Sequence, residues 1–483
     1  MNRFDLALAI KIVNTIRRNV RLRVIVLLAL AAATAYLTRH ALAAAATTIQ
    51  KDMSISDEEM GWVLAAFSAG YFFCQVPGGW LGNRIGTRAA FPLISVLWSS
   101  FHLITIFTHS FLSLFLLRFC YGAAQAGMVP LSAKVLKDWI PEEQRGIASA
   151  LIGASMSIGG VVAMWLTGNL LGRGLDWKVI FASYTLVGLV WAFTYYSCFR
   201  TYPHEHPSIS LDELEVIQGG TLTRRTNDVE EEEVTMDGER VTLFTFFDKE
   251  SDQLDEASRQ ETDPIVRKRD RLLSILALHV QSFFRAAGYG LFVSWFPAIL
   301  QYRFDLSVQQ AGGYAAIPLV GVIAGSTMGG FTVDFLQRQF KNRRLSRSYV
   351  AVVALTLSGL LTVGCSFTSH VSVVLVLMGM VGVASGAGSP SAWAATMDVA
   401  GNNTAVVMGS TNMAGTAGGF AMPVVLGYII GDIRESAVEG AAVAADWNVI
   451  FYFVAVIYGL GALSWLFVNP ESDPGYREES CGH

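Results

Sequence analysis

The chain has 483 residues, of which 52% are hydrophobic and only 15% are charged, and its formal net charge is −4. Soluble domains carry about 25% charged residues, so this composition excludes a soluble enzyme. The five cysteines are scattered, and their spacing fits neither a disulfide framework nor a metal site. We therefore expect no metal and no cofactor.

Apolar stretches long enough to cross a bilayer recur along the chain. A membrane-spanning helix needs roughly 20 apolar residues. Twelve such spans are predicted, at residues 23–49, 61–81, 88–108, 111–133, 147–171, 178–199, 272–300, 309–335, 349–368, 371–396, 405–431 and 447–468. The predicted fold class is therefore an all-α membrane protein with twelve transmembrane helices in two six-helix halves.

The remaining segments divide the chain. Residues 200–271 carry the acidic run Glu230 to Glu233 and a basic cluster from Arg267 to Arg271, so they cannot cross a bilayer and form a charged cytoplasmic linker. The predicted domains are an amphipathic N-terminal segment (1–22), an N-terminal bundle (23–199), the linker (200–271), a C-terminal bundle (272–468) and a cytoplasmic tail (469–483).

The orientation follows from lysine and arginine in the short loops, because loops rich in these residues stay in the cytoplasm. Basic residues gather between spans two and three, four and five, and eight and nine: Arg84, Arg88, Lys134, Lys137, Arg145, Arg338, Lys341, Arg343, Arg344 and Arg347. The opposite loops carry Asp57, Glu58, Glu59, Asp432 and Glu435. Both termini are therefore predicted to be cytoplasmic.

The two halves resemble each other and a known superfamily. Residues 79–88 (GWLGNRIGTR) close span two, and residues 329–334 (GGFTVD) close span eight at the same place in the second half. The first stretch resembles the gating loop motif of the major facilitator superfamily, carried here by Gly79, Asn83, Arg84, Gly86 and Arg88. Asn83 stands where the family usually has Asp, whereas Asp334 keeps the acid in the second half. The resemblance implies two bundles that rock about a site at the middle of the membrane.

Within that superfamily the chain resembles the anion:cation symporters, which carry organic anions. The likeness lies in three stretches: Tyr36-Leu37-Thr38-Arg39, Arg118-Phe119-x-x-Gly122-x-x-Gln125-Ala126-Gly127-x-x-Pro130, and Trp139-Ile140-Pro141 followed by Arg145-Gly146. The resemblance implies secondary transport of a carboxylate by alternating access. Sugar acids such as hexuronates and hexonates are the substrate class that it favours.

Three arginines lie inside predicted spans: Arg39 in span one, Arg118 in span four and Arg285 in span seven. A charge in the membrane is costly unless it is paired or used, and no acid lies deep in any predicted span. The missing partner is therefore predicted to be an anion. The resemblance gives Arg39 the contact with the acid group of the substrate. Arg118 serves equally well in an internal polar network, and Arg285, which matches no family motif, is a second candidate anion contact.

Five polar side chains are candidates for binding the hydroxyls of a polyol acid: Tyr36, Gln75, Tyr289, Ser389 and Asn412. Tyr36 precedes Arg39 by three residues and shares its helix face. Each of the five is also suited to an ordinary hydrogen bond between helices.

The positions that carry the coupling acids in the resembling symporters are occupied here by Thr38 and Gln125, and neither side chain titrates near neutral pH. Proton symport by the usual route is therefore not expected. Three modes stay open: anion exchange, facilitated passage, or coupling through another group, either His40 or a sodium ion.

Two rival functions remain at this point. One is an organophosphate:phosphate exchanger, because those proteins also pair arginines of spans one and seven. The other is a non-transporting membrane anion sensor that signals through residues 200–271. The overall prediction is a multi-pass protein of the cell (inner) membrane, a monomer, not an enzyme, with a small organic anion as its partner and no nucleic acid.

Overall fold

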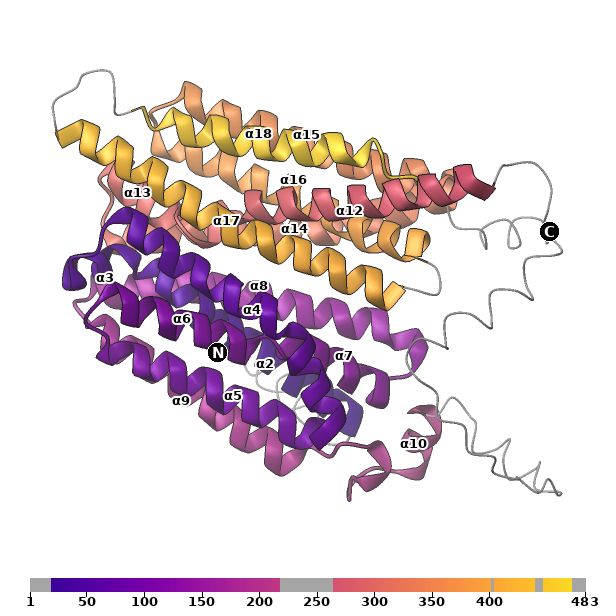
Figure 1. The fold of residues 1–483 in the computed structure, drawn as a ribbon. Helices are drawn as coiled ribbons and strands as arrows, with labels where there is room; N and C mark the ends of the chain where they lie inside the picture. The colour runs from indigo at the N-terminus through magenta and orange to yellow at the C-terminus, as the bar shows by residue number, and fades with distance from the viewer. Residues whose placement is uncertain (1–18, 218–263, 401–403, 439–445, 471–483) are drawn as a thin grey trace, which may run out of the picture.

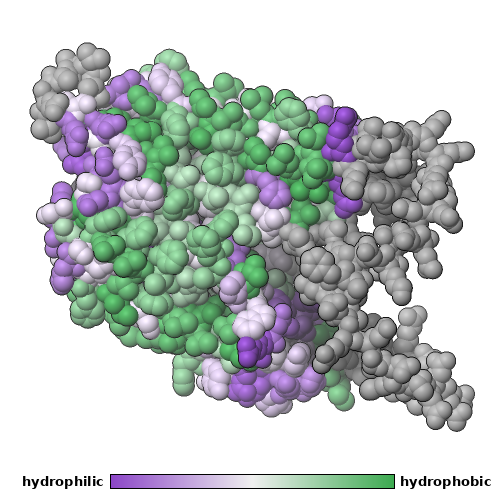
Figure 2. Space-filling view, viewed as in Figure 1, coloured by the Kyte–Doolittle hydropathy of each residue, from purple (hydrophilic) through white to green (hydrophobic). Residues whose placement is uncertain are grey.

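The computed structural model describes residues 19–217, 264–400, 404–438 and 446–470, and these form helices and loops without a strand. The two halves of the chain make two bundles that lie side by side (Figure 1). Apolar side chains cover the middle of the visible face and hydrophilic ones gather toward its two ends (Figure 2), as a bilayer requires.

The first bundle runs from α2 to α9. Its helices are α2 (Val20–Ala44), α3 (Ala46–Met53), α4 (Asp57–Ile85), α5 (Thr87–Ile104), α6 (Phe111–Gln125), α7 (Met128–Trp139), α8 (Glu142–Gly172) and α9 (Trp177–Cys198). The 3₁₀ turns η1 (Thr105–Phe107) and η2 (Pro203–Glu205) and the short α10 (Leu211–Ile217) complete this half.

The second bundle runs from α12 to α18. Its helices are α12 (Pro264–Val293), α13 (Phe296–Phe304), α14 (Val308–Phe340), α15 (Val350–Gly364), α16 (Val371–Ala400), α17 (Thr404–Val438) and α18 (Asn448–Trp465). A π-helical turn, η4 (Leu345–Tyr349), precedes α15, and the 3₁₀ turn η5 (Cys365–Phe367) follows it.

Ten of the described helices are long and apolar enough to cross a membrane, or eleven when the bent pair α12 and α13 is taken as one span. The prediction of an all-α, multi-pass membrane protein is therefore confirmed, although this count does not reach twelve. α4 is not among the ten, although it is 29 residues long. Its apolar run is interrupted by Gln75, Pro77 and the glycines that follow.

Three predicted spans differ in detail from the structure, because each is broken into two helices. The break in span one falls at Ala45, that in span four at Ala126 and Gly127, and that in span seven at Ser294 and Trp295, where the axis turns by 52°. Proline explains two of them. Pro130 and Pro297 lie in the first turns of α7 and α13, and a proline cannot donate the next helical hydrogen bond.

The two bundles use the same packing scheme. In the first half α2 packs on α8 and α9, α4 on α6, and α5 on α6 and α9. In the second half α12 packs on α17 and α18, α14 on α16, and α15 on α16 and α18. Glycines make the equivalent crossings close: a Cβ at Gly70 would meet the Phe119 carbonyl, and one at Gly325 would meet the Val383 carbonyl.

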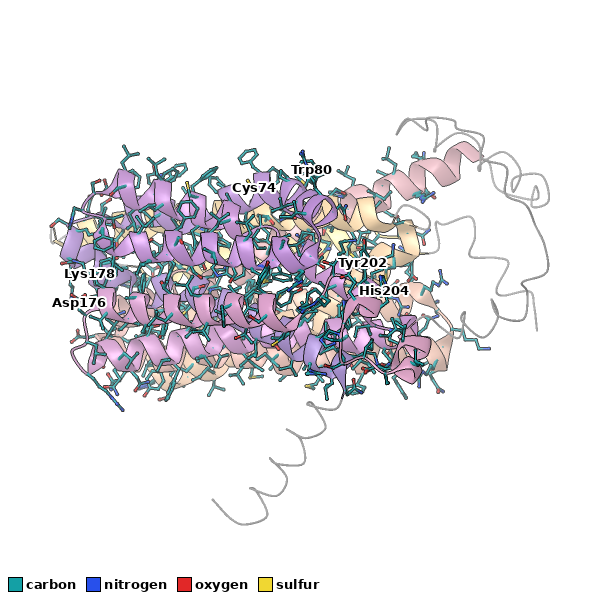
Figure 3. The ribbon with its side chains drawn as sticks, turned by 90° about the horizontal axis from the view of Figure 1, so that it is seen from below. Cys74, Trp80, Asp176, Lys178, Tyr202 and His204 are labelled. Carbon is teal, nitrogen blue, oxygen red and sulfur yellow. The ribbon has the colours of Figure 1, made fainter. Side chains whose placement is uncertain are left out.

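The halves meet through α4 against α17 and α8 against α14. Gly61 faces Gly427, and Gly168 faces Gly312, so backbones touch where α4 and α14 begin and where α8 and α17 end. We call this the acidic end, because Asp57 begins α4 there, and the opposite end, where α4 closes with Arg84, the basic end. Figure 3 marks the two ends by Asp176 and Lys178, and by Tyr202 and His204, on either side of α9.

Part of the predicted linker is ordered against the first bundle. The carboxylate of Glu213 in α10 accepts hydrogen bonds from the backbone N–H groups of Val20 (3.3 Å) and Arg21 (2.8 Å), which caps the start of α2. α12 begins at Pro264, eight residues before the predicted span. Residues 1–18 of the predicted amphipathic segment, residues 218–263 of the linker with its acidic run, and residues 471–483 of the tail lie outside the described residues.

Candidate substrate site

The centre of the candidate site is Arg39, half-buried near the end of α2. Its guanidinium carbon lies 4.2 Å from the centre of the Phe67 ring and 5.3 Å from that of Tyr36. None of the ion pairs found among the described residues involves Arg39. Aromatic faces stabilise a cation by about 0.5–2 kcal/mol, which is less than a buried carboxylate contact supplies. The guanidinium therefore keeps its capacity to bind an anion.

A second arginine lies beside the first. Arg118 on α6 is 5% exposed, and its Nη2 donates a hydrogen bond of 2.5 Å to the backbone carbonyl of Arg39. Its guanidinium carbon lies 4.8 Å from the centre of the Tyr121 ring and 5.3 Å from that of Phe67. The Nε atom of Arg118 is buried, and no residue that the structure describes forms a hydrogen bond with it. Arg118 thus both supports the backbone of α2 and adds a second uncompensated charge.

The two arginines share the ring of Phe67, so like charges approach each other in a region poor in water. Such charges repel strongly at the low effective dielectric of a protein interior. An anion bound between them would relieve this repulsion, and the carboxylate geometry matches the guanidinium fork. The arrangement therefore favours a small, negatively charged ligand.

Thr38 and Gln125, the predicted coupling positions, are neighbours in space. The Thr38 hydroxyl lies 2.7 Å from the Tyr121 hydroxyl, and Nε2 of Gln125 donates to the same hydroxyl at 2.9 Å. Gln125 also donates to the carbonyl of Ala35 at 3.1 Å, and Thr38 donates to that of Thr34 at 3.0 Å. Thr38, Tyr121 and Gln125 are all at most 1% exposed. They form a neutral, hydrogen-bonded network in which none of the three side chains is an acid.

The amide-bearing candidates join the two halves. Nδ2 of Asn412 on α17 donates to Oε1 of Gln75 on α4 at 3.1 Å, and Nε2 of Gln75 donates to the hydroxyl of Thr416 at 3.3 Å. These bonds join α4 to α17, so a ligand that competes for the amides would act on both bundles at once. Thr416, which sequence reasoning did not single out, lies one helical turn after Asn412 and joins this contact.

The remaining candidates divide into two groups. Tyr71 on α4, which the sequence did not single out, stacks at 5.7 Å on the Phe67 ring that Arg39 covers. Tyr289 on α12 is half-buried, and its ring meets that of Phe292 edge-on at 6.3 Å. By contrast, α12 approaches α18 at Arg285, where a Cβ added to Gly461 would lie 4.0 Å from the Arg285 backbone nitrogen, and the buried Nε of Arg285 has no hydrogen-bond partner among the described residues. No described contact joins Arg285 to Arg39. Ser389 lies half-buried on α16.

His40 is packed between α2 and α8. It is 3% exposed, its ring meets that of Tyr36 edge-on at 5.5 Å, and Gly160 of α8 gives it room. Its Nε2 atom has no hydrogen-bond partner within the described part of the chain. A bulkier residue than glycine at position 160 would press on this ring.

Residues 28–423 and, in a second match, 278–481 fit the sequence model of the Major Facilitator Superfamily. The chain belongs to that superfamily. It is 26% identical to the probable galactarate/D-glucarate transporter of Escherichia coli (strain K12) over 94% of this chain and 96% of the relative. It is also 26% identical to the hexuronate transporter of Bacillus subtilis (strain 168), over 90% of this chain and 94% of the relative. It is 25% identical to the galacturonate transporter of Dickeya chrysanthemi, over 70% of this chain and 89% of the relative.

Solved structures agree on the fold. The chain superposes with a TM-score of 0.65 on an inward-facing, unoccupied bacterial homolog of the human lysosomal transporter Spinster, at 17% identity and over 93% of this chain and 95% of the other. The D-xylose-proton symporter gives the same TM-score at 13% identity, over 93% and 98%. At these identities the likeness establishes the fold alone.

The loop motif of the superfamily lies at the basic end, between α4 and α5. Gly86 has φ +77° and ψ 152°, a conformation open essentially to glycine alone, and an added Cβ would lie 2.9 Å from the Thr201 hydroxyl. Arg88 donates through Nε to the Tyr196 carbonyl at 3.3 Å, which ties the turn to α9. Arg84 lies over the Trp80 ring at 5.0 Å, and Gly79 lets α4 approach Pro130. Asn83 and Asp334 are exposed.

The acidic end carries a polar cluster that sequence reasoning missed, which we call the latch: Gln50, Asp57, Tyr302 and Arg434. Arg434 of α17 binds Asp57 of α4 at 2.6 Å and lies over the Tyr302 ring at 4.3 Å. The Tyr302 hydroxyl donates to Gln50 at 3.1 Å, and Gln50 donates to Asp57 at 2.9 Å. Asp57 is 6% exposed. Its partner is 377 residues away, so no local pattern could have revealed the pair.

Proposed function

We propose that this chain is a secondary transporter that carries a sugar acid or a related organic carboxylate between its two halves by alternating access. The observation that carries the proposal is the pair Arg39 and Arg118: two guanidinium groups inside the bundle, with no acidic partner among residues 19–217, 264–400, 404–438 and 446–470. The names of the relatives, which include galactarate, glucarate and hexuronate transporters, support the same substrate class.

Each neighbour of Arg39 has a role in this proposal. The substrate carboxylate binds the Arg39 guanidinium, and Arg118 holds the Arg39 backbone and adds to the positive potential. Tyr36, Tyr71 and Tyr289 supply hydroxyls near that carboxylate, and Ser389 offers a further hydroxyl from α16. Gln75 and Asn412 exchange their mutual hydrogen bond for bonds to substrate hydroxyls, so binding weakens a contact between the halves and favours rocking. Arg285 is a second anion contact only in a conformation other than the one described here.

The coupling mode follows from the neutral network. Thr38 and Gln125 are satisfied by Tyr121 and by backbone carbonyls, so this network has no carboxylate to take up a proton. We propose exchange or facilitated passage in which Arg39 stays charged and the substrate itself neutralises it. Coupling through His40 or a sodium ion is the alternative that the experiments below separate.

The proposal includes a topology. α4 crosses the membrane in spite of its interrupted apolar run, since it packs along α6 and α17 inside the bundle, and this brings the number of spans to twelve. The basic end, with both termini, lies in the cytoplasm. Most of the described hydrogen bonds and ion pairs between the halves lie at the acidic end, whereas those of Gln75 with Asn412 and Thr416 lie nearer the basic end, and we infer that the site opens toward the basic end in this conformation. The protein works as a monomer in the cell (inner) membrane.

Uptake into proteoliposomes tests the function. Purified protein is reconstituted with an unlabelled hexuronate inside, and entry of labelled hexuronate is followed with and without a pH gradient and with and without sodium. We expect counterflow that needs no ion gradient and that excess hexuronate, but not the parent hexose, inhibits. Strict dependence on a proton or sodium gradient would contradict the coupling proposal, and inhibition by sugar phosphates alone would favour the organophosphate exchanger.

The replaced acids offer a gain-of-function test. The double variant Thr38→Asp, Gln125→Glu places two carboxylates around Tyr121, close to Arg118. We expect its uptake to depend on a proton gradient, which the native chain does not need. The isosteric control, Thr38→Val with Gln125 unchanged, loses the hydroxyl and should stay independent of the gradient. Gradient dependence that is the same in both variants and the native chain would count against the neutral network as the reason for uncoupled transport.

A further inference from the structure

A groove lies on the outer side of the second bundle, away from the candidate substrate site. It has a volume of about 530 Å³ and runs between α14, the turn η4 with α15, and α16. Its lining is almost wholly apolar, and its rim residues are exposed: Met328 is 59%, Val353 64% and Met380 48% exposed. In the membrane this side faces lipid.

The groove exists because its floor is made of small residues. Ala354 of α15 and Ala384 of α16 are each 6% exposed and form the floor, where longer side chains would fill the space. α14 and α16 touch at Gly329, where an added Cβ would meet the backbone of Ala387. Methionines on both rims adapt their shape to a flexible chain. Such a floor and rim suit one linear hydrocarbon chain.

The groove is long enough for one acyl chain of a phospholipid. On α14 its lining extends from Met328 to Leu336, about 12 Å along the helix axis, and on η4 and α15 it extends from Leu345 to Leu361, about 24 Å. Half of a hydrocarbon core of ~30 Å is about 15 Å, which is the depth that one acyl chain spans. The groove begins at the basic end, where Leu345 lies, and its length accommodates such a chain.

A surplus of positive charge lies at the basic end of the groove. Arg343 and Arg347 pair with Asp398 at 3.8 and 3.1 Å. Arg338, Lys341 and Arg344 are exposed, and Arg344 directly precedes Leu345, which lines the groove. Over this cluster five basic residues face two acids, Asp334 and Asp398, which leaves a net charge of 5 − 2 = +3. This charge lies where a phospholipid headgroup would be.

We propose that this groove is a binding site for an anionic phospholipid, whose acyl chain fills the apolar groove and whose phosphate headgroup binds Arg338, Lys341 and Arg344. Basic residues at a membrane surface attract anionic lipids, and three of them raise the affinity by roughly 100-fold over a zwitterionic lipid. The site lies within one half, so rocking of the bundles leaves it intact, and its lipid can stay bound throughout transport. The proposal does not depend on the identity of the transported anion.

The test uses the purified full-length protein, stripped of lipid by prolonged washing in detergent. Phosphatidylglycerol or phosphatidylcholine with identical acyl chains is added back, and the thermal unfolding temperature and the number of retained lipids, by native mass spectrometry, are measured. We expect half-maximal stabilisation at a roughly 100-fold lower concentration of phosphatidylglycerol than of phosphatidylcholine. Equal response to both lipids would overturn the proposal.

Two variants locate the site. Arg338→Gln with Lys341→Gln and Arg344→Gln should bring the response to phosphatidylglycerol down to that of phosphatidylcholine. Ala354→Leu with Ala384→Leu fills the floor and should weaken the response to both lipids. The control, Lys51→Gln with Arg173→Gln, removes exposed basic residues at the acidic end and should keep the native preference. A preference for phosphatidylglycerol that survives in the first variant would overturn the assignment of the headgroup. A response to both lipids that stays at the native level in the second variant would overturn the assignment of the acyl chain to the groove.

Discussion

The arginines of the latch and those of the candidate substrate site differ in whether an acidic side chain pairs with them. At the acidic end, Arg434 is held by Asp57 across the two halves, with Tyr302 and Gln50 around the pair. In the centre, Arg39 and Arg118 rest on aromatic rings and a backbone carbonyl, with no acidic partner among the described residues. In the latch the chain itself supplies the acid that pairs with the arginine. A charge left without one, in a place where burying it is costly, indicates a partner that comes from outside.

The largest expected effect is at the unpaired arginine. Arg39→Gln removes the charge and keeps most of the bulk, and the loss of one partner of a buried charge pair costs about 2 kcal/mol or more. Hexuronate counterflow should therefore fall at least about 30-fold. The control Arg173→Gln, an exposed residue at the acidic end, should transport normally. Native counterflow in Arg39→Gln would contradict the claim that the unpaired arginine of the site binds the substrate, whereas the paired arginine of the latch holds structure.

The paired arginine should behave differently. Asp57→Asn or Arg434→Gln breaks a charged hydrogen bond between the halves, which contributes about 1.5–3 kcal/mol. We expect each variant to lower the unfolding temperature, and the double variant to be little worse than either, because both changes remove the same bond. Asp52→Asn is the matched control, since Asp52 binds Lys178 and Trp177 of its own half. Additive losses in the double variant would show that the pair is not coupled.

At the basic end, Gly86→Ala tests a feature confined to one half. Alanine is strained at φ +77° and its Cβ would press on Thr201, so we expect a loss of roughly 1–3 kcal/mol in stability. Thermal unfolding measures it. Gly174, at φ +82° with open space around it, is the matched position for separating backbone strain from crowding. If Gly86→Ala and Gly174→Ala lower the stability by the same amount, crowding against Thr201 contributes nothing to the loss at Gly86.

The smallest effect is at His206, in the segment between α9 and α10 that covers the first half. Burial lowers the pKa of His206 below its ordinary value, with Arg23 and Arg200 acting in the same direction and the Cys198 carbonyl and Glu213 opposing them. A base with a lowered pKa in the folded state favours folding in its neutral form. The segment should therefore be fully docked above about pH 6.5 and loosen as the pH falls toward the folded-state pKa.

Hydrogen exchange of residues 199–217 at pH 7.5 and 5.5 measures this loosening. His206→Gln should remove the difference between the two pH values, because glutamine does not titrate. His204→Gln is the control, since His204 lies exposed beside Tyr202 (Figure 3). Loosening at low pH that persists in His206→Gln would assign it to another group.

The sequence predicted the class of fold well, because a membrane-spanning helix is determined by a continuous run of apolar residues and such a run can be read directly along the chain. The intramembrane arginines were visible for the same reason. The latch, the meeting of Thr38 with Gln125 at Tyr121, and the lipid groove were not predictable, since each depends on which helix faces which across the bundle. The breaks before Pro130 and Pro297 had a signal in the proline itself, whereas the break at Ala45 lies in an alanine-rich run that reads as continuous helix.

Ligand-induced stabilisation of the purified protein tests the unpaired charge most directly. The unfolding temperature is measured with a hexuronate, with the parent hexose and with neither, for the native chain and for Arg39→Gln. A ligand that binds the folded state raises this temperature by mass action. We predict a rise with the hexuronate only, and only when Arg39 is present. An equal rise with the uncharged hexose, or a rise with hexuronate that survives in Arg39→Gln, would contradict the account.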